Sequence, residues 1–186
     1  MFEEEIKKEL SEKRYNHSLN VAKKARELAK MYGADENKAY IAGLLHDVMK
    51  EADGEKQLKL LSQSDIILSR EQMSAPPLWH AYASAVYMRD VLGVEDEEIF
   101  DAVFYHTTGK ADMPKLTKII YLADMISEDR CYKEVPILRD LAEKDLDVAV
   151  MTALEMSVEF LKEKNAYICK DTFSALQFMK KEVVYD

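Results

Sequence analysis

The sequence is poor in cysteine, glycine and proline. Its 186 residues include two cysteines, five glycines and four prolines. Cys131 and Cys169 stand far apart without a CxxC partner, which argues against a disulfide framework or a thiolate zinc site. So little glycine and proline leaves few breaks for a turn-rich fold and favours helix.

The sequence also lacks an excess of basic charge and any long hydrophobic run. Its formal net charge of −9 argues against a nucleic-acid binder, because such proteins use a basic face to displace counterions from phosphates. No window approaches the ~18 apolar residues of a membrane span, and the opening segment MFEEEIKKELSEKRY has no signal-peptide core. We therefore expect no nucleic-acid partner, no membrane contact and a cytoplasmic location.

The composition that remains is helical. Apolar residues make up 48% of the chain and recur at spacings of three and four, and no stretch shows the sustained alternation of a strand. The length fits one domain, and no repeat or linker divides the chain. We predict an all-α fold with a single domain over residues 1–186.

Helix start and stop signals give the expected boundaries. The expected helices cover about residues 2–31 with a break near Ser11, 36–50 closed by Gly54, 55–61, 78–92, 96–106, 114–126, a short segment from 136, 145–164, and a last helix capped by Asp171 or Thr172. The segment with Pro76 and Pro77 should interrupt helix before residue 78.

Histidines fall on the apolar faces of these expected helices. His17 shares a stripe with Val21, and His106 follows Ile99 and Val103 at helical spacing. His80 leads a similar stripe. A single inward histidine is more often a hydrogen-bonded core residue, but all four histidines in the sequence follow this pattern.

Two aspartates add to this pattern. Asp124 lies four residues beyond Ile120 on the face of its helix that should be buried, and the His46-Asp47 pair ends an apolar segment. Buried carboxylates are costly unless they are paired or bind a metal. Imidazole and carboxylate ligands suit Zn, Fe, Mn or Co, and surplus ligands without cysteine favour an open, catalytic site over a structural zinc site.

The order of these residues resembles the HD superfamily of metal-dependent phosphohydrolases. The ordered set is His17, His46-Asp47, His80, His106 and Asp124. The segments RYNHSLNVA, AGLLHDVMK, YHTTG and IIYLADMISEDR are similar to the branch called YqeK, which is related to symmetrical bis(5'-nucleosyl)-tetraphosphatases. The resemblance implies an HD-domain helical bundle, with core motifs over about 14–130 and C-terminal helices over 137–184 that complete a nucleotide pocket.

The resemblance also implies roles for individual residues. The primary metal shell would be His17, His46, Asp47 and Asp124. The metal would be commonly iron, with Mn, Co, Ni or Zn as alternatives, and one or two ions would bind. His80 and His106 would face the substrate phosphates or a second metal.

Nucleotide contacts are implied further along the chain. They would come from Arg14, Thr107, Arg130 and the segment that includes Tyr167, Ile168 and Thr172. The sequence departs from the family pattern at two places: Cys169-Lys170 stands where His-Pro is usual, and Ala81 stands where a glycine often follows the third histidine. These departures concern substrate preference more than the metal site.

The chemistry expected of such a site is hydrolysis of a phosphoanhydride. A cation held there would lower the pKa of bound water and supply hydroxide at pH 7, with Asp47 or Asp124 orienting the water. Lys50, expected one helical turn after His46, would lie beside the phosphates or, equally, remain a solvated lysine at the helix end. On the family resemblance, we expect cleavage of diadenosine tetraphosphate into two ADP.

Other interpretations remain open at this point. The chain could be another HD nucleotidase, acting on a nucleoside mono- or triphosphate or a guanosine alarmone, or a nucleotide sensor without catalysis. Lys50-Glu51 occupies the positions where alarmone hydrolases usually carry an acidic pair. Apolar positions at Phe160, Leu161 and the last helix could pack internally or form a homodimer.

Overall fold

The computed structural model describes residues 2–185, except for the side chains of residues 184 and 185. Over that range the protein is made of helices and turns without a strand, which confirms the all-α prediction. The helices are α1 (Phe2–Glu9), α2 (Glu12–Tyr32), α3 (Glu36–Leu45), α4 (Gly54–Gln63), α5 (Arg70–Met73), α6 (Trp79–Val86), α7 (Glu97–Phe104), α8 (Lys115–Ile126), α9 (Val135–Ala142), α10 (Leu146–Glu163) and α11 (Lys170–Tyr185). Among the helices of residues 2–185, none combines the length and the apolar character needed to cross a bilayer.

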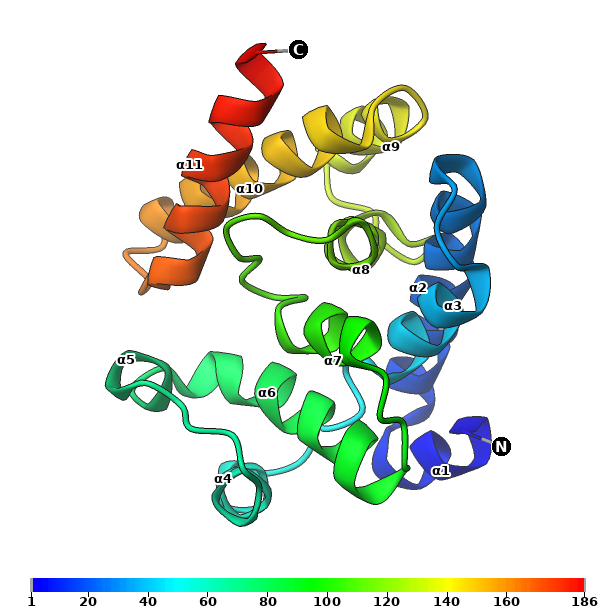
Figure 1. Cartoon of the computed structure of the whole chain (residues 1–186), viewed down its shortest axis with the longest axis vertical. Coiled ribbons are helices and arrows are strands. Elements are labelled where there is room, and N and C mark those ends of the chain that lie inside the picture. Colours follow the sequence, from blue (N-terminus) through cyan, green and yellow to red (C-terminus); the bar gives the residue numbers. More distant parts are fainter. Residues whose placement is uncertain (1, 186) are drawn as a thin grey trace.

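Helix α8 lies at the centre of the bundle. It packs against α2, α3, α7 and α10, and Figure 1 shows it end-on near the middle of the molecule. Ile119, Ile120, Leu122 and Ala123 are fully buried, so that almost the whole circumference of this helix is covered. Asp124, one residue further on, is thereby carried into the interior.

Helices α2 and α3 form the closest pair. Ser11 caps the start of α2, and Gly33 ends it in the left-handed conformation with a φ of 65°. A Cβ atom added to Gly43 would lie 2.8 Å from the Cα atom of Ala22. This backbone approach holds the end of α3 against the part of α2 that carries His17.

We expect Gly43→Ala to destabilise the protein by about 2 kcal/mol, because the added methyl group meets backbone atoms that cannot rotate away. A thermal melt should show a Tm lower by roughly 5 °C. Gly54→Ala is the matched control, since its Cβ would meet only the Trp79 ring at 3.5 Å. Equal stability of the two variants would contradict the close approach of α2 and α3.

Two predicted helix ends are wrong. The helix expected over residues 36–50 ends at Leu45, and tight turns follow, with Lys50 N donating to Asp47 O at 2.9 Å. The ring of His46 takes the carbonyl of Gly43 as a hydrogen-bond partner and so satisfies one of the terminal carbonyls of α3. Gly54 opens α4 instead of closing the preceding helix, because Asp53 supplies the N-cap.

Other boundaries differ in detail. The expected helix over 78–92 consists of the 3-10 turn η1 (Pro76–Leu78), α6 and the π-helical turn η2 (Tyr87–Val91). Helix α11 begins at Lys170, so Asp171 lies in its first turn and is not its cap. The predicted break near Ser11 is confirmed, and Asp96 and Asp145, which stand at the expected starts of their helices, are the N-caps of α7 and α10.

Candidate metal and phosphate site

The six predicted histidines and aspartates converge on one place in the bundle. They come from α2 (His17), the turn after α3 (His46 and Asp47), α6 (His80), the turn after α7 (His106) and α8 (Asp124). The ring centroid of His46 lies 5.4 Å from that of His17 and 4.9 Å from that of His106, and the rings of His80 and His106 are 5.4 Å apart. We call these six residues the His/Asp cluster.

Hydrogen bonds at Nδ1 orient the imidazoles. The Nδ1 atoms of His46 and His106 each lie 2.7 Å from a backbone carbonyl, of Gly43 and Val103 respectively. Because a carbonyl oxygen only accepts, each Nδ1 donates, and Nε2 keeps its lone pair. Both lone pairs therefore face the interior of the cluster, as metal ligands do when a second partner fixes the ring.

Asp47 lies between His46 on one side and His80 and His106 on the other. Its carboxylate is 2% exposed, and its Oδ1 atom lies 3.3 Å from His106 Nε2 and 3.4 Å from His80 Nε2. Its Oδ2 atom accepts a hydrogen bond from Arg14 at 2.9 Å and lies 3.6 Å from His46 Nε2. One carboxylate thus faces three imidazoles and a guanidinium.

Asp124 occupies the opposite side. Its Oδ1 atom lies 2.9 Å from His17 Nε2 and 3.7 Å from His46 Nε2. Arg130 donates to the same oxygen at 2.5 Å and to the Asp124 carbonyl at 2.7 Å. This guanidinium therefore lies directly at the edge of the cluster.

Unsatisfied buried atoms show that these residues fit a metal ion. His46 Nε2 and Asp47 Oδ1 are buried without a hydrogen-bond partner, a condition that costs roughly 1–3 kcal/mol per group. His106 Nε2, a lone-pair atom by its tautomer, also faces Asp47 Oδ1, and a cation between two such acceptors would make the contact favourable. The nitrogen and oxygen ligands suit a divalent transition metal.

The cluster offers three overlapping ligand triads. In each, one ligand atom from every residue lies within 4.8 Å of the others: His17, His46 and Asp47; His46, His106 and Asp124; Asp47, His80 and His106. Because the triads share residues, the geometry can accommodate one ion or two.

Burial keeps two of the imidazoles neutral. It lowers the pKa of His46 to about 4, and burial together with the nearby Lys50 ammonium lowers that of His80 to about 3. Burial would also lower the pKa of His17, but the hydrogen bond to Asp124, the charge of that carboxylate and the hydrogen bond to Asp129 together outweigh burial and raise that pKa. At neutral pH, His46 and His80 can therefore donate their lone pairs without first losing a proton.

Both aspartates remain ionised. Burial alone would raise their pKa values, but neighbouring hydrogen-bonding and cationic side chains, such as His17 beside Asp124, hold the pKa of Asp47 and that of Asp124 well below the usual range. Lys50 acts in the same direction on Asp47, and Arg130 on Asp124. The cluster thus combines charged carboxylates with the neutral imidazoles of His46 and His80, which is the protonation state that binds a cation.

We expect the metal-free protein, prepared with a chelator, to be less stable at pH 5 than at pH 7. The unfolded chain protonates His46 and His80 near pH 6.5, whereas the folded chain keeps them neutral to about pH 4 and about pH 3. The unfolded state binds more protons in this window, so each of these histidines lowers the free energy of unfolding by about 2 kcal/mol at pH 5. His17, whose folded pKa is raised, offsets part of this loss.

Urea unfolding in the presence of a chelator measures this pH dependence. His80→Gln should show a smaller loss between pH 7 and pH 5, because one of the two neutral imidazoles is gone. Unchanged or greater stability of the wild type at pH 5 would show that these histidines are not held neutral.

Lys50 reaches the cluster by a route that the sequence did not indicate. The expectation that it follows His46 on a continuing helix is wrong, because α3 ends at Leu45. The turn nevertheless places Lys50 Nζ 2.8 Å from His80 Nε2 and 3.8 Å from Asp47 Oδ1. Lys50 therefore lies at the cluster, with its side chain 34% exposed.

Thr107 also borders the cluster. Its hydroxyl lies 3.0 Å from His106 Nε2 and 3.3 Å from His80 Nε2. Thr107 and Lys50 thus lie beside His80, and Arg14 contacts the neighbouring Asp47.

Sequence reasoning missed Asp129, which was assigned only to a loop. Its Oδ2 atom lies 2.7 Å from His17 Nδ1, and Ser127 donates to its Oδ1 atom at 2.9 Å. Asp129 thus orients His17 as backbone carbonyls orient His46 and His106. Periodicity could not reveal this role, because Asp129 lies outside any helix.

The C-terminal segment expected at the nucleotide has no contact with the cluster among the described interactions. Tyr167 is 53% exposed, and its hydroxyl donates to Glu71 in α5. Thr172 is buried near the start of α11, and Ile168 is partly buried. Their roles at a nucleotide stay predictions.

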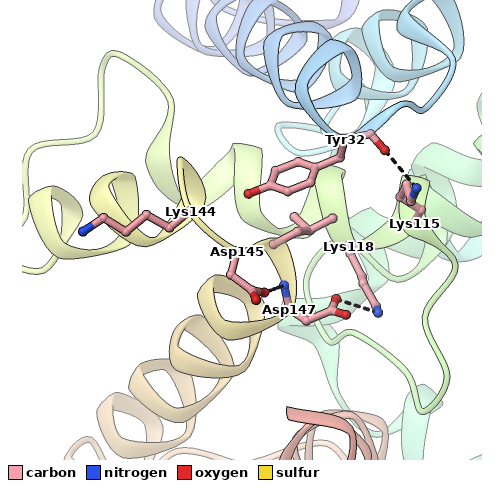
Figure 2. Close-up of a pocket in the computed structure, with 7 residues that line it drawn as sticks. Tyr32, Lys115, Lys118, Lys144, Asp145 and Asp147 are labelled. Atoms are coloured by element: carbon pink, nitrogen blue, oxygen red, sulfur yellow. Dashed lines mark hydrogen bonds and ion pairs between the residues drawn. The ribbon is translucent and has the colours of Figure 1, made fainter. Parts of the chain in front are cut away.

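A lysine-rich hollow of about 290 Å³ lies at the start of α10, apart from the cluster. Lys118 pairs with Asp147 at 2.7 Å, and Lys115 donates to the carbonyl of Tyr32 at 2.8 Å, as Figure 2 shows. Lys144 points away from both and pairs with Asp140. These ammonium groups are already occupied by protein oxygens, so the hollow does not resemble a phosphate site.

The fold and the His/Asp cluster define a helical protein with a candidate transition-metal centre. The HD domain family matches residues 14–129, a range that holds all six cluster residues. The chain belongs to the HD domain family.

Relatives cover nearly the whole chain. It is 39% identical over 174 residues to the symmetrical bis(5'-nucleosyl)-tetraphosphatase of Bacillus subtilis (strain 168), covering 90% of both proteins. The enzyme of that name from Staphylococcus aureus (strain NCTC 8325 / PS 47) is 35% identical over 92% of this chain and 89% of its own length. A crystal structure of a predicted HD superfamily hydrolase from Clostridium acetobutylicum, described as involved in NAD metabolism, superposes with a TM-score of 0.93 at 34% identity, covering 97% of this chain and 95% of that one.

Proposed function

We propose that this protein is a metal-dependent phosphohydrolase that cleaves diadenosine tetraphosphate symmetrically into two ADP. The observation that carries the proposal is the His/Asp cluster, in which lone pairs of buried imidazoles and carboxylates converge beside two arginines and a lysine. Relatives at 35% and 39% identity over about nine-tenths of the chain bear the name of that activity. A nucleotide substrate also fits the expected cytoplasmic location.

We assign the primary metal shell to His17, His46, Asp47 and Asp124. His80 and His106, with Asp47, would hold a substrate phosphate or a second ion. Iron is the proposed metal, with Mn, Co, Ni or Zn as alternatives that the same ligands accept. When bound, such a cation supplies Lewis acidity that lowers the pKa of water toward 7.

The cationic side chains would hold the polyphosphate. Arg14, Lys50 and Arg130 now contact cluster residues, and each can exchange such a contact for a phosphate oxygen. Thr107 can donate its hydroxyl hydrogen to the same phosphates. We further propose that Tyr167, Ile168 and Thr172 contact one nucleoside, so that the C-terminal helices complete the nucleotide pocket.

Asp47 or Asp124 would orient the attacking water, whose proton passes to solvent. The water oxygen bonds to the second phosphorus of the chain as the bond from that phosphorus to the central bridging oxygen breaks. Attack in line with this leaving oxygen yields one ADP from each half of the substrate. The arginines and Lys50 would stabilise negative charge on the non-bridging oxygens.

Chromatography of the products tests the proposed reaction. With Fe²⁺ under anaerobic conditions, or with Mn²⁺ or Co²⁺, diadenosine tetraphosphate should give ADP alone. AMP plus ATP would contradict symmetrical cleavage. Faster turnover of a nucleoside mono- or triphosphate or a guanosine alarmone would instead indicate another HD nucleotidase, and tight binding of the nucleotides without turnover would indicate a sensor.

A further inference from the structure

A hollow of about 800 Å³ opens beside the His/Asp cluster, between the end of α8, the loop that leads to α9 and the C-terminal half of α10. Its walls include Met125, Arg130, Tyr132, Met156, Phe160 and Glu163. We propose that this hollow, the α8/α10 pocket, binds one of the two nucleosides of the dinucleoside substrate. The inference rests on the proposed function and adds a second nucleoside site, distinct from the segment at Tyr167.

Arg130 connects the α8/α10 pocket to the cluster. It lines the pocket, and its guanidinium donates to Asp124 Oδ1 at 2.5 Å and lies 3.5 Å from His17 Nε2. A phosphate that Arg130 binds at the edge of the cluster would therefore have its attached nucleoside at the mouth of this pocket. A volume of about 800 Å³ is within the usual range for small-molecule sites.

The walls have the chemistry that a nucleobase requires. Tyr132 and Phe160 are aromatic, and Met125 and Met156 add polarisable thioethers. Bases stack on aromatic rings, and methionine packs well against flat aromatic groups. Phe160 is 57% exposed and Tyr132 38%, so part of the aromatic surface is open to a ligand. Lys164 Nζ lies 5.7 Å from the centroid of the Phe160 ring.

Part of this wall is preformed. The Tyr132 hydroxyl donates to the Met125 carbonyl at 2.6 Å, and Ser157 Oγ lies 3.9 Å from Met125 Sδ. Ser157 is itself 3.1 Å from the hydroxyl of Tyr121. A wall held in this way loses little conformational freedom when a ligand binds.

The charges favour a nucleoside over a further phosphate. Glu159 and Glu163 line the pocket, and neither forms an ion pair among the described side chains of residues 2–183. Lys133 and Glu134 also line it, but they lie 3.5 Å apart and offset each other's charge. Carboxylates repel phosphate groups but accept hydrogen bonds from ribose hydroxyls and amino groups. With Arg130 at the cluster and these carboxylates elsewhere in the wall, the pocket suits a substrate that is anionic at one end and neutral at the other.

The number of ADP molecules bound per chain tests this assignment. Calorimetric titration of the Mn²⁺-loaded protein should give two ADP per chain for the wild type and one for Phe160→Ala. Phe160 is largely exposed, so its removal should leave the fold intact. Ile67→Ala, which removes an apolar side chain that is 94% exposed in another part of the molecule, is the control and should bind two.

Kinetics supply an independent measurement. Phe160→Ala should raise the KM for diadenosine tetraphosphate about 10-fold, the order of effect of losing one stacking aromatic, with little change in kcat. Inorganic tetraphosphate, which has no nucleoside, should inhibit the Phe160→Ala variant as strongly as it inhibits the wild type. Tyr132→Ala should show the same pattern.

Several results would overturn the inference. One ADP per wild-type chain would do so, as would two ADP and an unchanged KM in Phe160→Ala. A change in molar mass with unaltered ADP binding would assign Phe160 to a dimer interface instead. If the wild type binds two ADP and Phe160→Ala one, but diadenosine tetraphosphate is not cleaved, then the proposed reaction is wrong and the nucleoside site stands.

Discussion

Asp47→Ala is expected to lower kcat/KM for diadenosine tetraphosphate by roughly 10³-fold or more, the scale of losing a group that stabilises transition-state charge. Asp47 belongs to two of the three triads, the one with His17 and His46 and the one with His80 and His106, so its loss weakens both of these ion positions. It also leaves Arg14 without its carboxylate partner. Metal content per chain, measured by mass spectrometry of the purified protein, should fall together with activity.

A matched control separates the loss of Asp47 from the loss of a carboxylate elsewhere in the protein. Asp101→Asn removes a negative charge that pairs with Lys110, outside the cluster, and should leave both metal content and activity near wild type. Circular dichroism of the two variants checks that each is folded. An Asp47→Ala protein that keeps its metal and a tenth of its activity would refute the proposed shell.

The helical period explains why the positions of most cluster residues could be predicted. His17, His80 and Asp124 lie on helices, where a spacing of three and four residues decides which side chains face the core. The apolar residues around them therefore predicted their burial, and the structure confirms that they converge. His106 was also expected to be buried, although it lies just beyond the end of α7.

Contacts formed in turns could not be predicted in this way. The carbonyls of Gly43 and Val103 that orient His46 and His106 belong to the backbone and leave no side-chain signal. The approach of Lys50 to His80 depends on where α3 ends, and helix ends are the least certain part of a pattern-based prediction. Asp129 orients His17 from a loop more than a hundred residues away.

The α8/α10 pocket shows a second limit. Its walls come from two segments, residues 125–134 and 156–163, whose apolar members individually match the pattern of core helices. Only the packing of α10 against α8 brings them together and leaves Phe160 partly uncovered. From the sequence alone, internal packing and a dimer interface were equally consistent with that phenylalanine.

Removing the metal is expected to lower the Tm by roughly 10 °C. A cation present at a thousand times its Kd stabilises the folded state by about 4 kcal/mol, and each kcal/mol moves the Tm of a chain of this size by about 2–4 °C. The physical reason lies in His46 Nε2 and Asp47 Oδ1, which are buried without a partner unless an ion binds them. Thermal melts with and without a chelator, followed by titration of single metals, measure the effect.

The choice of metals makes this experiment specific to the cluster. Fe²⁺, Mn²⁺, Co²⁺, Ni²⁺ and Zn²⁺ should each restore the Tm, because imidazole ligands suit them, whereas Mg²⁺ and Ca²⁺ prefer oxygen ligands and should restore little. Asp124→Asn should show a much smaller response to every metal, while Asp101→Asn should respond like the wild type. Equal stabilisation by Mg²⁺, or a full response of Asp124→Asn, would mean that the ions bind elsewhere. The number of equivalents needed to reach the plateau then decides whether the overlapping triads hold one ion or two.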